Sequence, residues 1–127
     1  MRVVVTGDRW LERRDLVLKT LNELTLIETL AHGGCRDPRT HQLRGVDKVA
    51  AEWAIHEAKI PCTEYPADWG TWGLRAGPVR NTIMLLDFKP TLVLGFPGPV
   101  PKGTLDCMRK ARRMGIEVRE FPYERVR

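Results

Sequence analysis

The sequence predicts an α/β domain in three layers, with a mainly parallel five-stranded sheet between two layers of helices. Short apolar runs rich in β-branched residues alternate along the chain with amphipathic segments, and this alternation is typical of a parallel sheet with helical crossovers. The run Leu92-Val93-Leu94 contains no polar residue, as expected for a central strand that is covered on both faces. Three of the strand-like runs also lead into loops that contain glycine.

Five strands and four helices account for most of the chain. We expect strands over residues 2–6, 25–32, 61–65, 91–96 and 116–121. We expect helices, from apolar residues at helical spacing, over residues 15–24, 47–59, 77–87 and 104–114. Thr104 is expected to cap the last helix, and Gly115 to end it. Residues 35–44 and 68–73 are expected to be loops.

Length and composition indicate a single globular domain over residues 1–127. The chain is 43% hydrophobic and 29% charged, which is an ordinary globular balance. Its apolar runs fall far short of the ~20 residues that cross a bilayer, and Gly7 and Asp8 interrupt the N-terminal run too early for a signal peptide. We therefore expect a cytoplasmic protein without a membrane partner. Three cysteines without a C-x-x-C pair argue against disulfides and a metal site, and no cofactor is expected.

The formal net charge of +5 favours anionic partners. Much of the excess lies within residues 109–113 and 119–127. Runs of this kind are usually solvated helix faces. The few aromatic residues do not interleave with the basic ones, so a stacking platform for single-stranded nucleic acid is not indicated.

The candidate site lies where the strands end. The carboxyl ends of parallel strands meet at one edge of the sheet, where α/β domains bind ligands. Glycines allow a close backbone approach, and helix N-termini hold phosphate. The residues that the three loops bring to this edge are Thr6, Gly7, Arg9, His32, Gly33, Gly34, Pro97, Gly98, Lys102, Gly103 and Thr104. No loop matches a dinucleotide-binding or P-loop motif, and a purely structural turn is the alternative for each.

Arg80 is expected in the first turn of a helix, where a basic residue opposes the helix dipole. We expect it to meet an anion, with Gly77 and Asn81 beside it; a surface carboxylate is the alternative partner. Asp106 lies in the first turn of the last helix, where the dipole explains it without any function. Trp69 is a candidate to stack on a base, or equally to cover the core.

The sequence also resembles the YspA-type domains of the SLOG superfamily, which includes the Lonely Guy phosphoribohydrolases and the DNA-processing protein DprA. The residues that carry the resemblance are Val5-Thr6-Gly7-Asp8-Arg9, His32-Gly33-Gly34, Gly45-Val46-Asp47 with Ala50-Ala51-Glu52-Trp53-Ala54, Ala67-Asp68-Trp69, Ala76-Gly77-Pro78-Val79-Arg80-Asn81 with Met84, and Phe96-Pro97-Gly98 with Gly103-Thr104. The resemblance implies a Rossmann-like fold, a nucleotide-binding role that includes Asp47, and assembly into a homo-oligomer.

In the Lonely Guy enzymes an arginine and a glutamate help to cleave an N-glycosidic bond. The resemblance places these catalytic roles on Arg80 and Asp106, where Asp is one methylene shorter than Glu. Two further departures are an insertion over residues 37–44 and Pro99, which stands where the family commonly has glycine and removes one N–H donor.

Three functions follow, in order of preference. The first is binding of a nucleotide or nucleotide-derived phosphate ligand, as a sensor or sequestering domain. The second is hydrolysis of an N-glycosidic bond in a nucleoside phosphate. The third is nucleic-acid binding similar to that of DprA.

Overall fold

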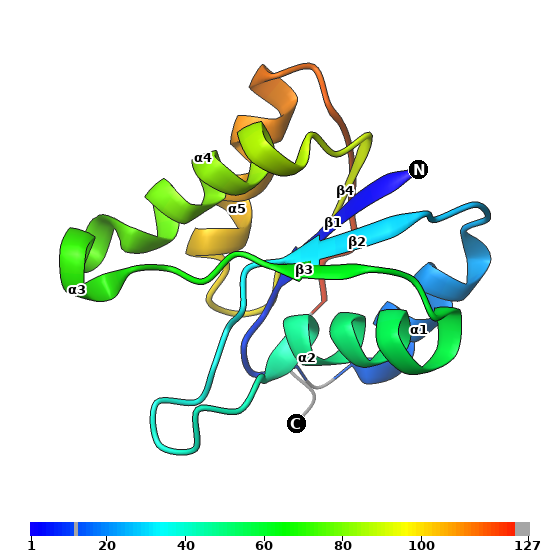
Figure 1. The fold of residues 1–127 in the computed structure, drawn as a ribbon, viewed down its shortest axis with the longest axis horizontal. Helices are drawn as coiled ribbons and strands as arrows, with labels where there is room; N and C mark the ends of the chain where they lie inside the picture. Colours follow the sequence, from blue (N-terminus) through cyan, green and yellow to red (C-terminus); the bar gives the residue numbers. More distant parts are fainter. Residues whose placement is uncertain (12, 124–127) are drawn as a thin grey trace.

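The computed structural model describes residues 1–11 and 13–123, and its centre is a sheet of five parallel strands (Figure 1). The predicted α/β fold class is therefore confirmed. In spatial order the strands are β3 (Cys62–Glu64), β2 (Thr29–His32), β1 (Arg2–Gly7), β4 (Leu92–Phe96) and β5 (Glu117–Glu120). The chain leaves β1 to build one side of the sheet and returns to β4 to build the other. This reversal of strand order is the point at which Rossmann-like folds bind their ligands.

Helices cover both faces of the sheet, which gives the three expected layers (Figure 1). One face carries α1 (Arg14–Glu23) and α2 (Gly45–Glu52), which runs on as a π-helical segment, η1 (Trp53–Ala58). The other face carries α4 (Ala76–Phe88) and α5 (Lys102–Arg113). A short helix, α3 (Trp69–Trp72), and the 3₁₀ turn η2 (Gly73–Arg75) lead into α4.

The alternation of side chains along the two central strands explains why both faces are covered. Val3 and Val5 belong to the buried cluster under α1 and α2, whereas Val4 belongs to the cluster under α4 and α5. In β4, Leu94 faces the first cluster and Val93 the second. Successive strand residues point to opposite faces, so a fully apolar strand needs apolar helices on each side.

The segment after β5 returns to the carboxyl edge of the sheet. The Phe121 ring stacks on Phe96 with 5.2 Å between ring centroids. The Tyr123 hydroxyl donates a hydrogen bond of 2.8 Å to Oδ2 of the buried Asp8, whose Oδ1 accepts from the Trp10 N–H at 3.1 Å. These contacts fix the loop that follows β1, and with it one wall of the candidate site.

The prediction that residues 25–27 begin the second strand is wrong, because β2 starts at Thr29. Leu26 is 84% exposed and has a positive φ of 61°. Its carbonyl oxygen accepts a 2.6 Å hydrogen bond from the N-terminal ammonium group. The pair Leu26-Ile27 looks like a strand in sequence, but it forms a turn that leads into the sheet.

Two local predictions near the site are also wrong. The segment 68–73 is not a plain loop, since Asp68 caps α3 by accepting a 3.1 Å hydrogen bond from the Thr71 N–H. Thr104 does not cap the last helix, because α5 begins at Lys102 and Thr104 is buried in its first turn. Gly115 does follow the end of α5, with a φ of 76°, as predicted.

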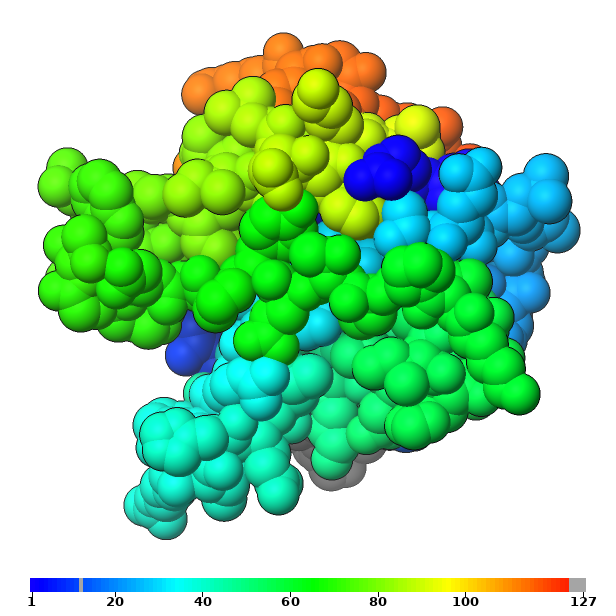
Figure 2. All heavy atoms as spheres, in the orientation of Figure 1, coloured from blue at the N-terminus to red at the C-terminus, as the bar shows by residue number. Residues whose placement is uncertain are grey.

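The inserted segment 35–44 leaves the carboxyl edge as a hairpin-like loop, and it projects from the body in the space-filling view (Figure 2). An antiparallel bridge joins Arg36 and Leu43, and the Arg36 guanidinium pairs with Glu64 of β3. Within the described part of the chain, no helix combines the length and the apolarity needed to cross a membrane. The basic run predicted over residues 119–127 lies partly outside the described residues.

A matched pair of leucine substitutions tests the position of the core. Leu94→Ala removes a side chain that is fully buried in β4, so we expect a loss of about 2–5 kcal/mol in the free energy of unfolding. Leu26→Ala removes a side chain that is 84% exposed, and the expected change lies within about 0.5 kcal/mol. Urea-induced unfolding followed by circular dichroism measures both; similar losses would mean that Leu26 is packed in a core.

Candidate functional site

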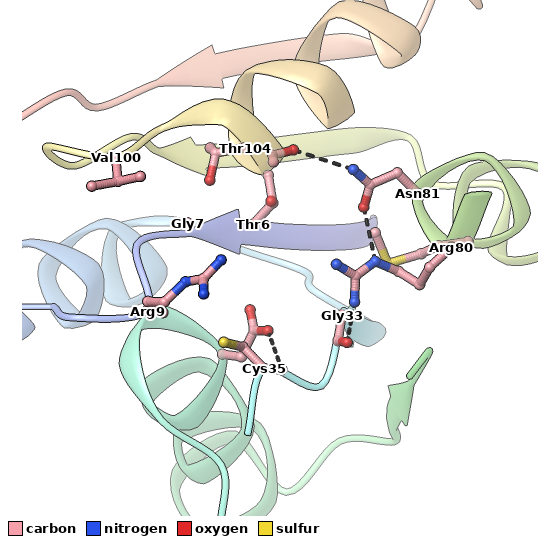
Figure 3. Close-up of a pocket in the computed structure, with 12 residues that line it drawn as sticks. Thr6, Gly7, Arg9, Gly33, Cys35, Arg80, Asn81, Val100 and Thr104 are labelled. Carbon is pink, nitrogen blue, oxygen red and sulfur yellow. Dashed lines mark hydrogen bonds between the residues drawn. The ribbon is translucent and has the colours of Figure 1, made fainter. Parts of the chain in front are cut away.

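A cleft opens at the carboxyl edge of the sheet, above the ends of β1 and β2 and beside the N-termini of α2, α4 and α5 (Figure 3). Its volume is about 80 Å³, against the ~300 Å³ or more of pockets that enclose a whole small ligand. The space suits a group the size of a phosphate. The residues that line it are Thr6, Gly7, Arg9, Gly33, Cys35, Asp47, Arg80, Asn81, Met84, Val100, Gly103 and Thr104.

Arg80 reaches from α4 across to the end of β2. Its Nη1 donates to the carbonyl oxygens of Gly33 and, at 3.3 Å, of Tyr65, and its Nε donates to Oδ1 of Asn81 at 2.9 Å. Among the described residues no carboxylate pairs with this guanidinium, and Nη2 makes no hydrogen bond. The chain therefore holds Arg80 in place through carbonyl and amide oxygens and leaves Nη2 for a ligand.

Asn81 connects Arg80 to α5. Its Nδ2 donates to the Gly103 carbonyl at 3.2 Å and to Oδ2 of Asp106 at 3.0 Å. The same carboxylate oxygen of Asp106 pairs with the Lys110 ammonium at 3.0 Å. Asp106 thus holds Asn81 between the two helices, and it is not among the residues that line the cleft.

The N-terminus of α5 forms one wall of the cleft. The residue before the helix, Pro101, has no N–H. Within the described residues, the backbone N–H groups of Lys102, Gly103 and Thr104 donate no hydrogen bond. Unpaired N–H groups at a helix start carry partial positive charge and bind anions. In Figure 3 the guanidinium groups of Arg9 and Arg80 point into the same space, so three sources of positive potential converge there.

Asp47 brings a negative group to the opposite wall. It lies in the first turn of α2, is 6% exposed, and accepts a 2.8 Å hydrogen bond from the Cys35 N–H through Oδ2. Burial raises the pKa of this carboxyl, although His32, the Cys35 N–H and Arg80 oppose the shift. Burial also lowers the pKa of His32, whose Nδ1 accepts from the Gly34 N–H at 3.0 Å. That imidazole is therefore neutral at pH 7, with its proton on Nε2.

Most of the glycines at this edge are required by packing within the chain. A Cβ on Gly33 would lie 2.7 Å from Cζ of Arg80, and a Cβ on Gly98 would lie 2.6 Å from the carboxyl carbon of Asp8. Gly34 has a φ of 67°, which side chains rarely adopt. Gly103 differs, because a Cβ there would meet no atom within 4 Å. Its small size is not needed by any described neighbour, and it lines the cleft.

The sequence-predicted site residues divide into two sets. The structure brings Thr6, Gly7, Arg9, Gly33, Asp47, Arg80, Asn81, Gly103 and Thr104 together around the cleft. It places Gly34, Trp69, Gly77, Pro97, Gly98, Lys102 and Asp106 outside the lining. Trp69 is 58% exposed on α3, with Gly77 packed beside its ring.

Three lining residues were missed by sequence reasoning, namely Cys35, Met84 and Val100. Each had a signal. Cys35 follows the Gly33-Gly34 pair directly, and Met84 lies one helical turn after Arg80 on the same face of α4. Val100 belongs to the loop between β4 and α5, for which the sequence predicted site residues only at glycines, prolines, Lys102 and Thr104.

The fold and the cleft define a Rossmann-like α/β domain whose candidate site lies at the switch point of the sheet. The sequence model of the family YAcAr, described as the YspA, cpYpsA-related SLOG family, matches residues 1–72. The chain belongs to this family, as its sequence predicted. The match includes the loops after β1 and β2 and Asp47, but it ends before Arg80.

The chain also matches a curated relative over nearly its whole length. The chain is 32% identical over 128 aligned positions to the Gene 61 protein of Mycobacterium phage D29, with 94% of this chain and 95% of the relative covered. No solved structure matches the chain.

Two glycine substitutions test the packing around Arg80. Gly33→Ala forces the guanidinium out of its position and breaks its hydrogen bond to the Gly33 carbonyl, so we expect a loss of about 1–3 kcal/mol in stability. Gly103→Ala meets open space in a helix, and we expect stability to stay equal or rise by up to about 1 kcal/mol. Thermal unfolding measures both variants. Equal stability in the two would show that Arg80 does not depend on the gap at Gly33.

Proposed function

We propose that the cleft binds the phosphate group of a nucleotide or nucleotide-derived ligand, and that the protein acts as a sensor or sequestering domain. Membership in the SLOG family suggests nucleotide-related ligand binding or processing. The observation that carries the proposal is the convergence of the unpaired N–H groups at the start of α5 with Arg9 and Arg80. A phosphate between them exchanges water for charge-assisted hydrogen bonds.

The dimensions of the cleft support one phosphate as the enclosed part of the ligand. A space of about 80 Å³ corresponds to two or three water molecules at ~30 Å³ each. The sugar then lies at the rim, and the base extends past it, between the loop of residues 35–44 and the loop that carries Val100. This size favours a small ligand over a nucleic acid, for which binding remains a sequence-based prediction.

The surroundings of Asp106 support binding rather than hydrolysis. Its Oδ2 is engaged by Asn81 and Lys110, at 3.0 Å each, and these contacts give it a role in holding α4 against α5. Hydrolysis of an N-glycosidic bond by Arg80 and Asp106 stays a prediction from the resemblance, as does homo-oligomerisation.

Calorimetric titration with AMP, ADP-ribose and cyclic AMP tests the proposal. We expect at least one of them to bind with a Kd below about 1 mM, which corresponds to a binding free energy of about −4.1 kcal/mol. Arg9→Ala should weaken that binding about fivefold or more, because it removes an exposed guanidinium that faces the phosphate.

Arg113→Ala is the matched control. Arg113 is also exposed but lies in the last turn of α5, outside the cleft lining, so the net charge changes equally while the Kd should stay within about twofold. If none of the three nucleotides binds below millimolar concentration, the proposal is wrong. If both arginine substitutions weaken binding equally, the loss of affinity comes from the change in net charge and not from a contact between Arg9 and the phosphate.

A further inference from the structure

Among the described residues that line the cleft, Asp47 is the one carboxylate. Its Oδ2 is occupied by the Cys35 N–H, whereas its Oδ1 makes no hydrogen bond within the described part of the chain. Oδ1 is not among the fully buried side-chain atoms of the described residues that lack a partner, so it keeps a small exposure, although Asp47 as a whole is only 6% exposed. The carboxylate thus has one oxygen bonded within the protein and one unbonded oxygen, on a residue that lines the cleft.

A structural role does not require a charge at this position. Helix dipoles favour an acid in the first turn, but the burial of Asp47 opposes the charged form and raises its pKa. An asparagine would keep the acceptor for the Cys35 N–H and avoid that cost. A carboxylate near a bound phosphate also repels it. The acidic group therefore costs stability and opposes anion binding, and a residue with both costs points to a function.

Resting on the proposed function, we infer that Asp47 accepts hydrogen bonds from the hydroxyl groups of the sugar next to the phosphate, and so makes the cleft selective for a ribose phosphate. The cleft then has two unlike walls. Arg9, Arg80 and the start of α5 supply donors for the phosphate oxygens, and Asp47 supplies an acceptor for hydroxyl donors. A ligand with both groups satisfies both walls, whereas a bare phosphate leaves Asp47 without a partner.

The exchange of one atom isolates this role. In Asp47→Asn the amide oxygen still accepts from the Cys35 N–H, while an NH₂ donor replaces the oxygen that faces the cleft. We expect the variant to fold with a melting temperature at or above that of the wild type, because no charge is buried. Glu57→Gln is the control: it removes an exposed charge from η1, outside the cleft lining.

The experiment compares ribose 5-phosphate, 2-deoxyribose 5-phosphate and inorganic phosphate by calorimetry. The wild type should bind ribose 5-phosphate about tenfold or more tightly than inorganic phosphate, the size of effect expected for a hydrogen bond to a charged acceptor. Asp47→Asn should lose most of this preference, through weaker binding of ribose 5-phosphate and unchanged or tighter binding of inorganic phosphate. Glu57→Gln should keep the preference. If the wild type binds 2-deoxyribose 5-phosphate more weakly than ribose 5-phosphate and Asp47→Asn does not, the 2-hydroxyl group is a hydrogen-bond partner of Asp47.

The two proposals fail in different ways. If the wild type binds none of the three probes or the nucleotides, the phosphate site and the role of Asp47 are both wrong. If the wild type binds ribose 5-phosphate and phosphate equally, or if Asp47→Asn keeps the preference, the phosphate site stands and the role of Asp47 is wrong. If Asp47→Asn binds all three probes more weakly by the same factor, Asp47 only holds the loop at Cys35 in place, and its proposed role in sugar recognition is wrong.

Discussion

The position of the Arg80 guanidinium is the constraint on which the candidate site depends. It joins the end of β2, through the Gly33 carbonyl, to α4 and, through Asn81, to the start of α5. Each such bond from a charged donor contributes about 1.5–3 kcal/mol, so the three elements hold one another in register. The gap at Gly33 admits the side chain, since any Cβ there would displace it. The cleft is the space that remains beside this connection, and its walls are set by the same contacts.

The polar groups of the cleft differ from those on the rest of the surface in their pairing. Exposed ion pairs such as Arg13–Asp15 and Arg112–Glu120 satisfy both charges. In the cleft, Nη2 of Arg80 and Oδ1 of Asp47 are left without partners among the described residues, and the first N–H groups of α5 are unpaired too. Groups of both signs are thus available to a ligand in one space. They fit a ligand that carries an anion and hydroxyl donors together.

The sequence predicted the fold and much of the site because their signals are local and periodic. The apolar residues on both sides of β1 and β4 predicted a sheet that is covered on both faces, and the parallel order of the strands predicted that their carboxyl ends meet at one edge. Other features depend on contacts that sequence order hides. The exposure of Leu26 follows from the hydrogen bond of its carbonyl to the N-terminus, and the orientation of Asp106 follows from Lys110 and Asn81. The glycines at Gly33 and Gly98 were read as room for a ligand, but the side chains of Arg80 and Asp8 occupy that room.

Amide chemical shifts report whether a phosphate binds at the carboxyl edge of the sheet. In a titration of ¹⁵N-labelled protein with AMP, we expect the largest shifts for the backbone amides of Gly103 and Thr104, together with the Nε resonance of Arg80. The amides at the Gly33–Cys35 turn should respond as well, because they share the cleft. Shifts that leave these groups unmoved and gather on the outer face of α5, at Arg109, Arg112 and Arg113, would contradict a phosphate site at the carboxyl edge of the sheet.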